Sequence, residues 1–295
     1  MLLQLLIFPG KLVLRLLAVG VGLVVLMVLV VAVRYWSWTP EPAASFYEKR
    51  YLLNWGHRGA PEAAPENTLS SFEAAVELGA DGVELDVMLS ADGKIVVIHD
   101  YNLDKTTDGT GPVKNYSLAE LKQLDAGYWF SGDFAGEYIP EHIPTLQEVI
   151  DDLDSSVFLN IEIKSESPAT DGLEKAVVQT IARNNLYERV IVSSFNPISL
   201  LRVKLADKRI DVGLIYAPDL PKYLSEGWFI SILRPEALHP HYDMVNEDYM
   251  AWARKKGFRV NVWTVNETAE MAQMIELGVD GIITDRPDVL RQLLQ

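Results

Sequence analysis

The sequence predicts an α/β protein, a (β/α)₈ TIM barrel with an insertion after strand 2, preceded by one N-terminal transmembrane helix. Short apolar or alternating stretches recur eight times between helix-length stretches over the 255 residues that follow residue 40. This is the size and rhythm of such a barrel. No glycine-rich dinucleotide loop follows the first predicted strand, so a doubly wound open sheet is the second choice. The transmembrane helix is predicted from an uninterrupted apolar stretch near the N-terminus.

That apolar stretch, Leu16 to Val33, holds 18 residues without a charge or a proline. At about 1.5 Å per residue, a helix of this length comes close to spanning the hydrocarbon core of a bilayer. Basic residues flank it, and tyrosine and tryptophan follow it at positions 35, 36 and 38, as is typical of membrane interfaces. We therefore expect a membrane segment at residues 1–39, with the span at about 12–34, and a linker at residues 40–50.

A cleaved signal peptide is the alternative interpretation of this segment. The stretch is longer than a usual signal h-region, and no small-x-small cleavage site follows it before the Pro40-Glu41-Pro42 sequence. Lys11, Arg15 and the free amino group outweigh Arg34 on the other side, which predicts a cytoplasmic N-terminus. The expected protein is a single-pass membrane protein whose folded domain lies outside the cytoplasm.

Charge and cysteine content exclude several classes of function. The chain has 41 acidic and 26 basic residues, and residues 1–40 contain three of the basic ones and no acid, so the remainder carries a net charge of −18. Such a domain repels phosphate backbones, so no nucleic-acid partner is expected. The chain has no cysteine, which excludes disulfides, thiolate metal sites and cysteine nucleophiles.

The barrel is expected over residues 51–295, with each strand bounded by turn residues. Predicted strands are 53–57, 82–89, 157–164, 190–195, 211–216, 237–239, 259–265 and 281–284. Ser70-x-x-Glu73 is a capping box that would open a helix ending at Gly79. Further helices are predicted at 145–153, 173–184, 197–206, 247–256, 271–277 and 287–294.

One connection is too long for a strand-to-helix loop, so residues of about 90–143 are interpreted as an insertion. Long insertions usually carry function. This one contains an aromatic cluster, which would form either a lid over a pocket or the insertion's own small core: Tyr128, Trp129, Phe130, Phe134 and Tyr138.

Acidic residues alternate with apolar ones on two predicted strands. Glu84 and Asp86 share one face of the second strand, and Glu162 lies on the corresponding face of the third, between Asn160 and Lys164. In a barrel that face is the interior. Three carboxylates cannot all stay ionised there without a counter-charge, because like charges and desolvation both raise their pKa values. A divalent cation resolves the conflict, and an all-oxygen set favours Mg²⁺, Ca²⁺ or Mn²⁺ over zinc. A structural ion network with Lys164 and arginine is the alternative.

Two histidines are directed at the same place. His57 closes the first strand between two glycines, where a ligand can approach the backbone closely. The Ala91-Asp92-Gly93 turn folds residues 95–99 back on the second strand, and pairing symmetric about residue 92 sets His99 opposite position 85. A metal with two imidazoles is suited to displacement at phosphorus, where one imidazole removes a proton and the other protonates the leaving oxygen.

These residues belong to an ordered set of motifs: His57-Arg58-Gly59, Pro65-Glu66-Asn67-Thr68, Glu84-Leu85-Asp86-Val87, His99-Asp100 and Glu162-Ile163-Lys164. In order and separation the set resembles the glycerophosphodiester phosphodiesterases. The resemblance continues through 192–195, 262–266 and 283–287 and covers about residues 52–294. It implies a (β/α)₈ barrel with an insertion after the second strand.

The resemblance also implies roles. His57 and His99 would be the acid–base pair, and Glu84, Asp86 and Glu162 would bind one divalent cation. Arg58 and Lys164 would contact phosphate, and Trp263 would pack on the glycerol of the substrate. Without the resemblance, Trp263 would be interpreted as filling of the barrel.

The expected reaction converts a glycerophosphodiester and water into glycerol 3-phosphate and an alcohol. The nucleophile is left open between water and the substrate's own hydroxyl, and His57 is favoured as base with His99 as acid. The alternative enzyme is a lysophospholipase D that acts on membrane lysophospholipids. The acyl chain of such a lipid would lie against the aromatic cluster of the insertion. A non-catalytic, membrane-tethered binding module is the alternative of another class.

Neighbouring polar residues have structural interpretations. Glu66 and Asn67 are expected to shape the first loop and to help cap the next helix. Lys105 replaces the arginine usual in the family and lacks its bidentate fork. The remaining histidines are expected to be structural or loop residues: His142, His239 and His241.

Overall fold

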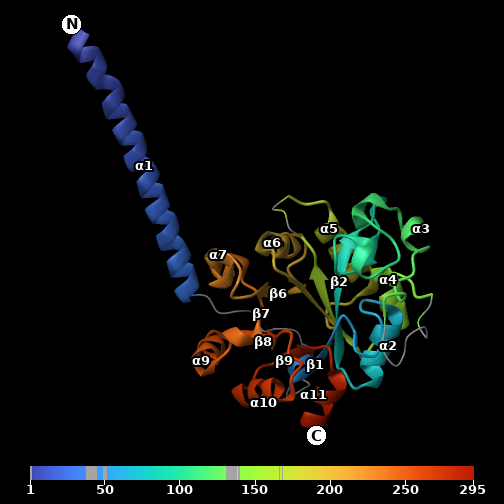
Figure 1. Cartoon of the computed structure of the whole chain (residues 1–295). Helices are drawn as coiled ribbons and strands as arrows, with labels where there is room; N and C mark the ends of the chain where they lie inside the picture. The colour runs from blue at the N-terminus through green and yellow to red at the C-terminus, as the bar shows by residue number, and fades with distance from the viewer. Residues whose placement is uncertain are drawn as a thin grey trace.

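The computed structural model of the chain describes residues 2–37, 45–48, 52–130, 138, 140–165, 167 and 169–295. Most of the predicted linker, together with Phe134 of the aromatic cluster, lies outside these residues. Figure 1 shows a rounded α/β body and one long helix, α1 (Leu2–Ser37), which extends away from it.

Eight parallel strands form a closed barrel, as the sequence predicts. Pairing of β1 with both β2 and β9 closes the sheet, in the order β1-β2-β4-β5-β6-β7-β8-β9. The short β3 lies outside the ring, antiparallel to β2. The strands are β1 (Leu53–His57), β2 (Gly82–Leu89), β3 (Ile95–Val97), β4 (Phe158–Ile163), β5 (Val190–Ser194), β6 (Asp211–Tyr216), β7 (Ala237–Pro240), β8 (Arg259–Val262) and β9 (Gly281–Thr284).

Helices follow the barrel strands and bury the outward faces of the sheet. The barrel helices are α2 (Leu69–Glu77), α4 (Leu146–Asp152), α5 (Leu173–Asn184), α6 (Pro197–Ala206), α7 (Lys222–Ser225), α8 (Ile230–Leu233), α9 (Glu247–Lys256), α10 (Thr268–Leu277) and α11 (Pro287–Leu293). Short 3₁₀ turns lie at η1 (Ser45–Glu48) and η4 (Tyr242–Met244). On β2, for example, Val83, Leu85 and Val87 are buried in the main apolar core, so the alternating residues point into the barrel.

The N-cap predicted for α2 is wrong by two residues. Thr68, not Ser70, is the N-cap: its side chain accepts a hydrogen bond from the Ser71 amide and donates one to the Pro65 carbonyl. The Ser70 hydroxyl instead donates to Glu141 of the insertion. A threonine two residues upstream satisfies the first turn equally well, and the tertiary partner decides between them.

The insertion between β2 and α4 builds a small core of its own against the barrel. It contains β3, η2 (Leu103–Lys105), η3 (Val113–Asn115) and α3 (Leu118–Leu121). This core combines Met88 of β2 with buried, mostly aliphatic side chains of the insertion: Val96, Ile98, Leu103, Val113, Leu121, Ala126 and Ile143. Of the aromatic cluster, Phe130 is buried and stacks edge-on against Trp129 and Tyr138, while Tyr128 is exposed.

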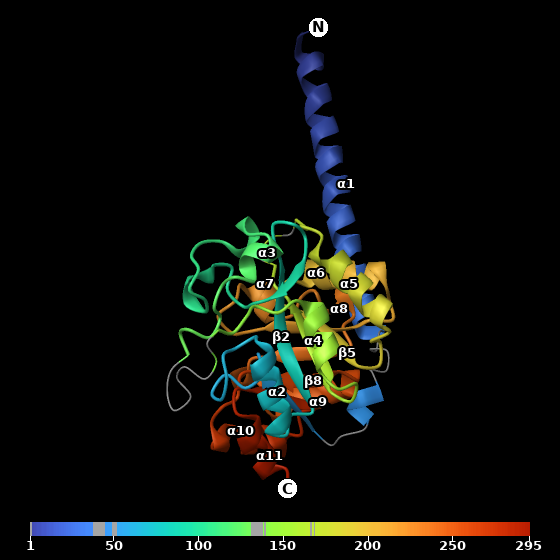
Figure 2. The ribbon, with the colours of Figure 1, turned by 90° about the vertical axis from the view of Figure 1, so that its right-hand side faces the viewer.

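The long helix α1 contains an apolar segment, Lys11–Val33, with a mean hydropathy of 3.2 and no burial within the protein. Length and composition suit either a membrane span or a signal sequence. The helix packs on α8, and because its N-terminal end lies far from the body (Figure 1), this contact lies toward its C-terminal end. In both views the helix points away from α10 and α11, which lie at the other end of the body (Figures 1 and 2).

Candidate active site

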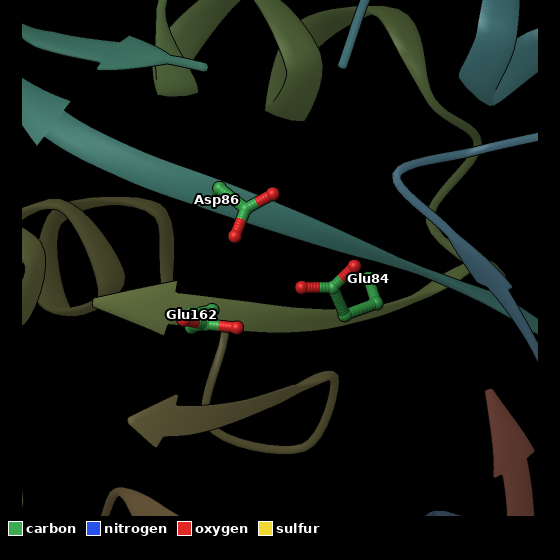
Figure 3. Close-up of side chains that lie close together, drawn as sticks. All are labelled: Glu84, Asp86 and Glu162. Atoms are coloured by element: carbon green, nitrogen blue, oxygen red, sulfur yellow. The ribbon is translucent and has the colours of Figure 1, made fainter. Parts of the chain in front are cut away.

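Three buried carboxylates gather inside the barrel near the carboxyl ends of β2 and β4. Asp86 is paired with Glu162 in the parallel register of these strands, and Glu84 lies one pleat earlier on β2. Figure 3 shows the three side chains directed toward one another from the two neighbouring strands. One ligand oxygen of each lies within 4.8 Å of those of the others, and each residue is less than a tenth exposed.

Two cations accompany the carboxylates. Lys164 Nζ lies 2.9 Å from Glu162 Oε1 and 3.4 Å from Asp86 Oδ1. The Arg58 amide donates to Glu84 Oε2 at 3.0 Å, and its guanidinium lies 3.5 Å from Asp86 and 2.8 Å from Glu66. With Glu66 included, four carboxylates face two cations, so the fully ionised group carries two excess negative charges.

The acidities of the three carboxyls reflect this excess. Burial raises the pKa of Glu84 well above its ordinary value, and the charges on Asp86 and Glu162 raise it further. Burial raises the pKa of Glu162 as well, despite Lys164. Asp86 is equally buried, but Lys164 and Arg58 outweigh the effect of burial and lower its pKa. The cluster therefore favours a further positive charge, and its all-oxygen donor set fits a hard divalent cation.

His57 lies at the end of β1, beside this cluster. Its Nδ1 atom is 2.6 Å from Oδ1 of Asp285, the residue that immediately follows β9. Asp285 is itself held by Asn266, whose side-chain amide donates to Oδ2 at 2.6 Å and accepts the Asp285 amide N–H at 2.9 Å. Asp285 is largely buried, yet the hydrogen bond to His57 outweighs burial and lowers its pKa. This arrangement leaves Nε2 of His57 as the nitrogen available to a substrate.

His99 is held in the same way from the insertion. Its Nδ1 atom is 2.7 Å from Asp100 Oδ1, and burial lowers its pKa, an effect that nearby Asp86 only partly offsets. The predicted register is confirmed: Val97 pairs with Val87, and the Ile98 amide donates to the Asp86 carbonyl at 3.0 Å. Continuing this ladder by one residue sets His99 opposite position 85.

A cavity of about 110 Å³ connects these groups. Its lining contains both histidines together with predicted site residues on β1, β2 and β4, namely Arg58, Glu84 and Glu162. Trp263 also lines the cavity, where it stacks edge-on against Phe195 at 5.3 Å and donates from Nε1 to the His239 carbonyl at 2.8 Å. Lys164 lies next to Glu162 and lines the adjoining groove. All eight predicted site residues are thus brought to one end of the barrel.

Comparison with known proteins agrees with this geometry. Residues 57–289 match the model of the glycerophosphoryl diester phosphodiesterase family. The chain therefore belongs to this family. A glycerophosphodiester phosphodiesterase of Caldanaerobacter subterraneus subsp. tengcongensis is 45% identical over 242 residues, which cover 81% of this chain and 96% of that protein. The glycerophosphodiester phosphodiesterase of Bacillus subtilis is 32% identical, over 86% and 92% of the two chains.

Solved structures of the family share the fold. A phosphodiesterase of Oleispira antarctica, in complex with the product sn-glycerol-3-phosphate, matches with a TM-score of 0.70 and 32% identity over 81% of this chain and 95% of that one. A glycerophosphodiester phosphodiesterase of Agrobacterium tumefaciens matches with a TM-score of 0.69 and 29% identity, over 82% and 99%.

Three side chains hold the catalytic and metal-binding candidates in place, and the sequence does not predict these contacts. Asp285 and Asp100 orient the two histidines. Asn67 donates to Asp86 Oδ2 at 2.9 Å and accepts the Asp86 amide at 3.1 Å. Barrel closure could have predicted the contact of Asp285 with His57, because β9 must neighbour β1. The pairing of Gly56 with Thr284 then places His57 and Asp285 side by side.

The first loop is shaped by Glu66 and Asn67, as expected, but neither of them caps α2. Glu66 pairs with Arg58 and Asn67 supports Asp86, whereas Thr68 alone caps α2. Arg58 and Asn67 both adopt left-handed backbone conformations, with φ of 53° and 59°. The loop therefore folds tightly over the carboxylates instead of serving the helix.

The other polar side chains near the site fit their structural interpretations. His239 is fully buried, with Nε2 2.9 Å from Asn261 Nδ2, and burial lowers its pKa to about 3. His241 stacks on Tyr242 in η4, and His142 is exposed. Lys105 is 63% exposed and lies 3.4 Å from Asp100.

Proposed function

We propose that this member of the family hydrolyses glycerophosphodiesters to glycerol 3-phosphate and an alcohol, with one divalent cation and a two-histidine acid–base pair. The single observation that carries the proposal is the buried carboxylate trio facing two imidazoles, each held at Nδ1 by a carboxylate. The names of the relatives and the product bound by the Oleispira antarctica structure support the same substrate class. A non-catalytic module would tolerate the loss of a ligand or a histidine, and all five residues are present.

The side chains divide into three roles. Glu84, Asp86 and Glu162 would hold Mg²⁺, Ca²⁺ or Mn²⁺, which would withdraw charge from the phosphate and make the attacking hydroxyl more acidic. The phosphate contacts are assigned to two cations already at the cluster, Arg58 and Lys164. Trp263, which also lines the cavity, would pack on the glycerol.

His57 is assigned as the general base and His99 as the general acid. Hydrogen bonding of each Nδ1 to a carboxylate orients the ring and leaves Nε2 to exchange a proton with substrate oxygens. The base takes a proton from the nucleophile, which is water or the substrate's own glycerol hydroxyl. The acid delivers a proton to the oxygen of the departing alcohol.

Metal dependence is tested with full-chain protein and glycerophosphocholine. Chelation is expected to abolish turnover, and adding back Mg²⁺, Ca²⁺ and Mn²⁺ separately identifies the ion. Calorimetric binding of that ion should be lost in Asp86→Asn and retained in Asp92→Asn, an exposed turn carboxylate. Full turnover in excess chelator would overturn the metal mechanism.

The two histidine roles are separated by the leaving group. A glycerophosphodiester whose alcohol is p-nitrophenol needs no protonation on departure, so His99→Ala should retain most of its activity on it but lose roughly 10²–10⁴-fold on glycerophosphocholine. His57→Ala should lose activity on both substrates. The reverse pattern would exchange the assignments, and full activity of His57→Ala on glycerophosphocholine would contradict the pair altogether.

A second candidate function, hydrolysis of lysophospholipids, is favoured by an apolar groove. The groove has a volume of about 500 Å³ and begins at Glu162 and Lys164, a size typical of small-molecule sites. We call it the apolar groove, because its wall is formed by apolar side chains that follow β5 and β6: Phe195, Pro197, Ile198, Tyr223, Leu224 and Phe229. An acyl chain would lie there, not against the aromatic cluster of the insertion. Turnover of lysophosphatidylcholine relative to glycerophosphocholine tests this candidate.

The arrangement of the chain fits a membrane-held enzyme. We propose that residues 1–39 anchor the protein, that residues 40–50 link the anchor to the barrel of residues 51–295, and that residues of about 90–143 are its insertion. The barrel would lie outside the cytoplasm as a single-pass protein. Protease protection of the barrel in sealed vesicles, with detergent-opened vesicles as control, tests this orientation.

A further inference from the structure

The segment between β6 and β7 exposes large apolar side chains at the rim of the apolar groove. In this segment, residues 222–233, Trp228 is 62% exposed and Tyr223 and Ile232 are each 47% exposed. Outside α1 they account for three of the few large exposed apolar residues of the described chain. Such a concentration at one place on a surface marks a contact with another apolar phase.

The segment is built to present these side chains. Gly227 has a φ of 63°, and a Cβ there would meet Ile230 Cδ1 at 2.5 Å, so the chain folds back sharply between α7 and α8. Ile230 and Leu233 anchor α8 in the core. Trp228 Nε1 donates to Glu226 at 3.0 Å, which fixes the indole with its ring outward. An amphipathic indole of this kind is the side chain that favours the membrane–water interface.

The long helix identifies the apolar phase. The helix α1 packs on α8, and its N-terminal end lies far from the body (Figure 1), so the contact lies toward its C-terminal end. The apolar segment of α1 ends at Val33. If that segment spans a bilayer, its end lies at the bilayer surface, and α8 lies there with it.

The apolar groove opens toward the same surface. Tyr223, Leu224 and Phe229 belong both to the exposed segment and to the groove wall, and Tyr223 and Phe229 stack at 6.4 Å. At its inner end the groove reaches Glu162 and Phe195, which also line the catalytic cavity. A continuous apolar path thus leads from the rim to the carboxylates.

We propose that residues 222–233 dock into the interfacial layer of the bilayer that α1 spans, so that the apolar groove receives the single acyl chain of a membrane-held phosphodiester. The docking rests on α1 being a span, and the acyl-chain role deepens the proposed hydrolysis. The partner is a lipid surface, and the substrate class is a phosphodiester with one apolar tail.

The absence of cysteine from the chain allows a direct test with single labels. Ile232→Cys, Val24→Cys and Leu205→Cys are each labelled with an environment-sensitive dye in full-chain protein reconstituted in phosphatidylcholine vesicles. Val24 lies in the apolar segment of α1, whereas Leu205 is 77% exposed near the far end of α6. Quencher-bearing phosphatidylcholine should lower the emission at positions 24 and 232 by at least about two-fold and leave position 205 unchanged.

Other outcomes overturn the docking in distinguishable ways. If the dye at position 24 were quenched while the dyes at positions 232 and 205 were not, α1 would span the bilayer but residues 222–233 would not dock. Emission at 24 that resists quenching would remove the span and the docking together. The quenching measurements do not depend on catalysis. A failure of the proposed hydrolysis would therefore not be confused with a failure of docking.

Activity provides the second readout. The double variant Trp228→Ala and Ile232→Ser should lower turnover of vesicle-held lysophosphatidylcholine by about ten-fold, because two apolar anchors are lost, and leave soluble glycerophosphocholine turnover unchanged. An unchanged rate on both substrates, or an equal loss on both, would contradict an interfacial role. A wild-type protein that turns over neither substrate would reject the proposed function, whereas turnover of glycerophosphocholine alone would reject only the acyl-chain role.

Discussion

The two sides of the barrel mouth are built on different principles. On the side of β1, β2, β4 and β9, charged groups are tied to one another: Arg58 contacts two carboxylates, and each histidine is held by an aspartate. On the side that follows β5 and β6, the wall is apolar, and three large apolar side chains at its rim are 47% exposed or more. One side is pre-organised for a charged group, and the other offers a surface to an apolar one.

The difference shows how one barrel combines chemistry with substrate selection. Buried charges remain in place only where paired partners hold them, so the charged side tolerates little change. An apolar wall has no such partners and is altered by volume alone. Substitutions on the charged side should therefore lower the turnover of glycerophosphocholine and lysophosphatidylcholine alike, whereas those on the apolar side should change the choice between these two substrates.

The largest effect is expected at Asp285, which positions His57 without contacting substrate. In Asp285→Asn the amide can donate to Nδ1 and turn the imidazole into the wrong tautomer, so kcat should fall by roughly 10²–10⁴-fold on every substrate. KM and the melting temperature should change little, because the hydrogen bonds to Asn266 permit an amide. The measurement is steady-state kinetics with thermal unfolding as a check.

Asp288→Asn, three residues further along in α11, is the matched control and should retain wild-type kcat. A loss of kcat in Asp285→Asn that is matched by a large fall in melting temperature would show a structural role instead. Wild-type kcat in this variant would contradict the positioning of His57 by Asp285.

The chain shows which features a sequence can predict. Alternation of apolar and acidic residues identified β2 and β4, because the period of two assigns one face to the core and the other to the interior. The Ala91-Asp92-Gly93 turn set the register of His99, because a tight hairpin leaves no freedom in pairing. These are local patterns, and local physics determines them.

Contacts between distant segments were harder to predict. Asp285 meets His57 through barrel closure, across 228 residues of sequence. The apolar groove combines the segments after β5 and β6, and α7 and α8 are single turns, too short for a helical period. Ser70 was predicted as a helix cap because its actual hydrogen-bond partner, Glu141, lies far away in the sequence, in the insertion. In each case the deciding partner is remote in the chain.

A smaller and selective effect is expected from filling the apolar groove. Ile198 lines it at the first turn of α6 and is half-buried, so Ile198→Trp adds volume where an acyl chain would lie. Turnover of lysophosphatidylcholine should fall by about ten-fold, since a blocked chain forfeits the burial of several methylenes. Turnover of glycerophosphocholine should stay within about two-fold of wild type, because that substrate lacks a chain.

Leu205→Trp, seven residues later on the same helix and exposed, controls for the new indole and should affect neither substrate. Equal losses on both substrates in Ile198→Trp would show that the groove serves the reaction centre and does not select an apolar tail.

The smallest effect is expected at Lys105, on the charged side but at its exposed margin. Lys105 is 63% exposed and lies 3.4 Å from Asp100, whereas Lys164 is 11% exposed and contacts two cluster carboxylates. An exposed pair contributes about 0–1 kcal/mol, so Lys105→Ala should lower kcat/KM for glycerophosphocholine by less than about five-fold. Lys164→Met, of similar length without charge, should lower it far more. If the two variants lost equal activity, Lys105 would also contact the phosphate, and the charged side would extend into the insertion.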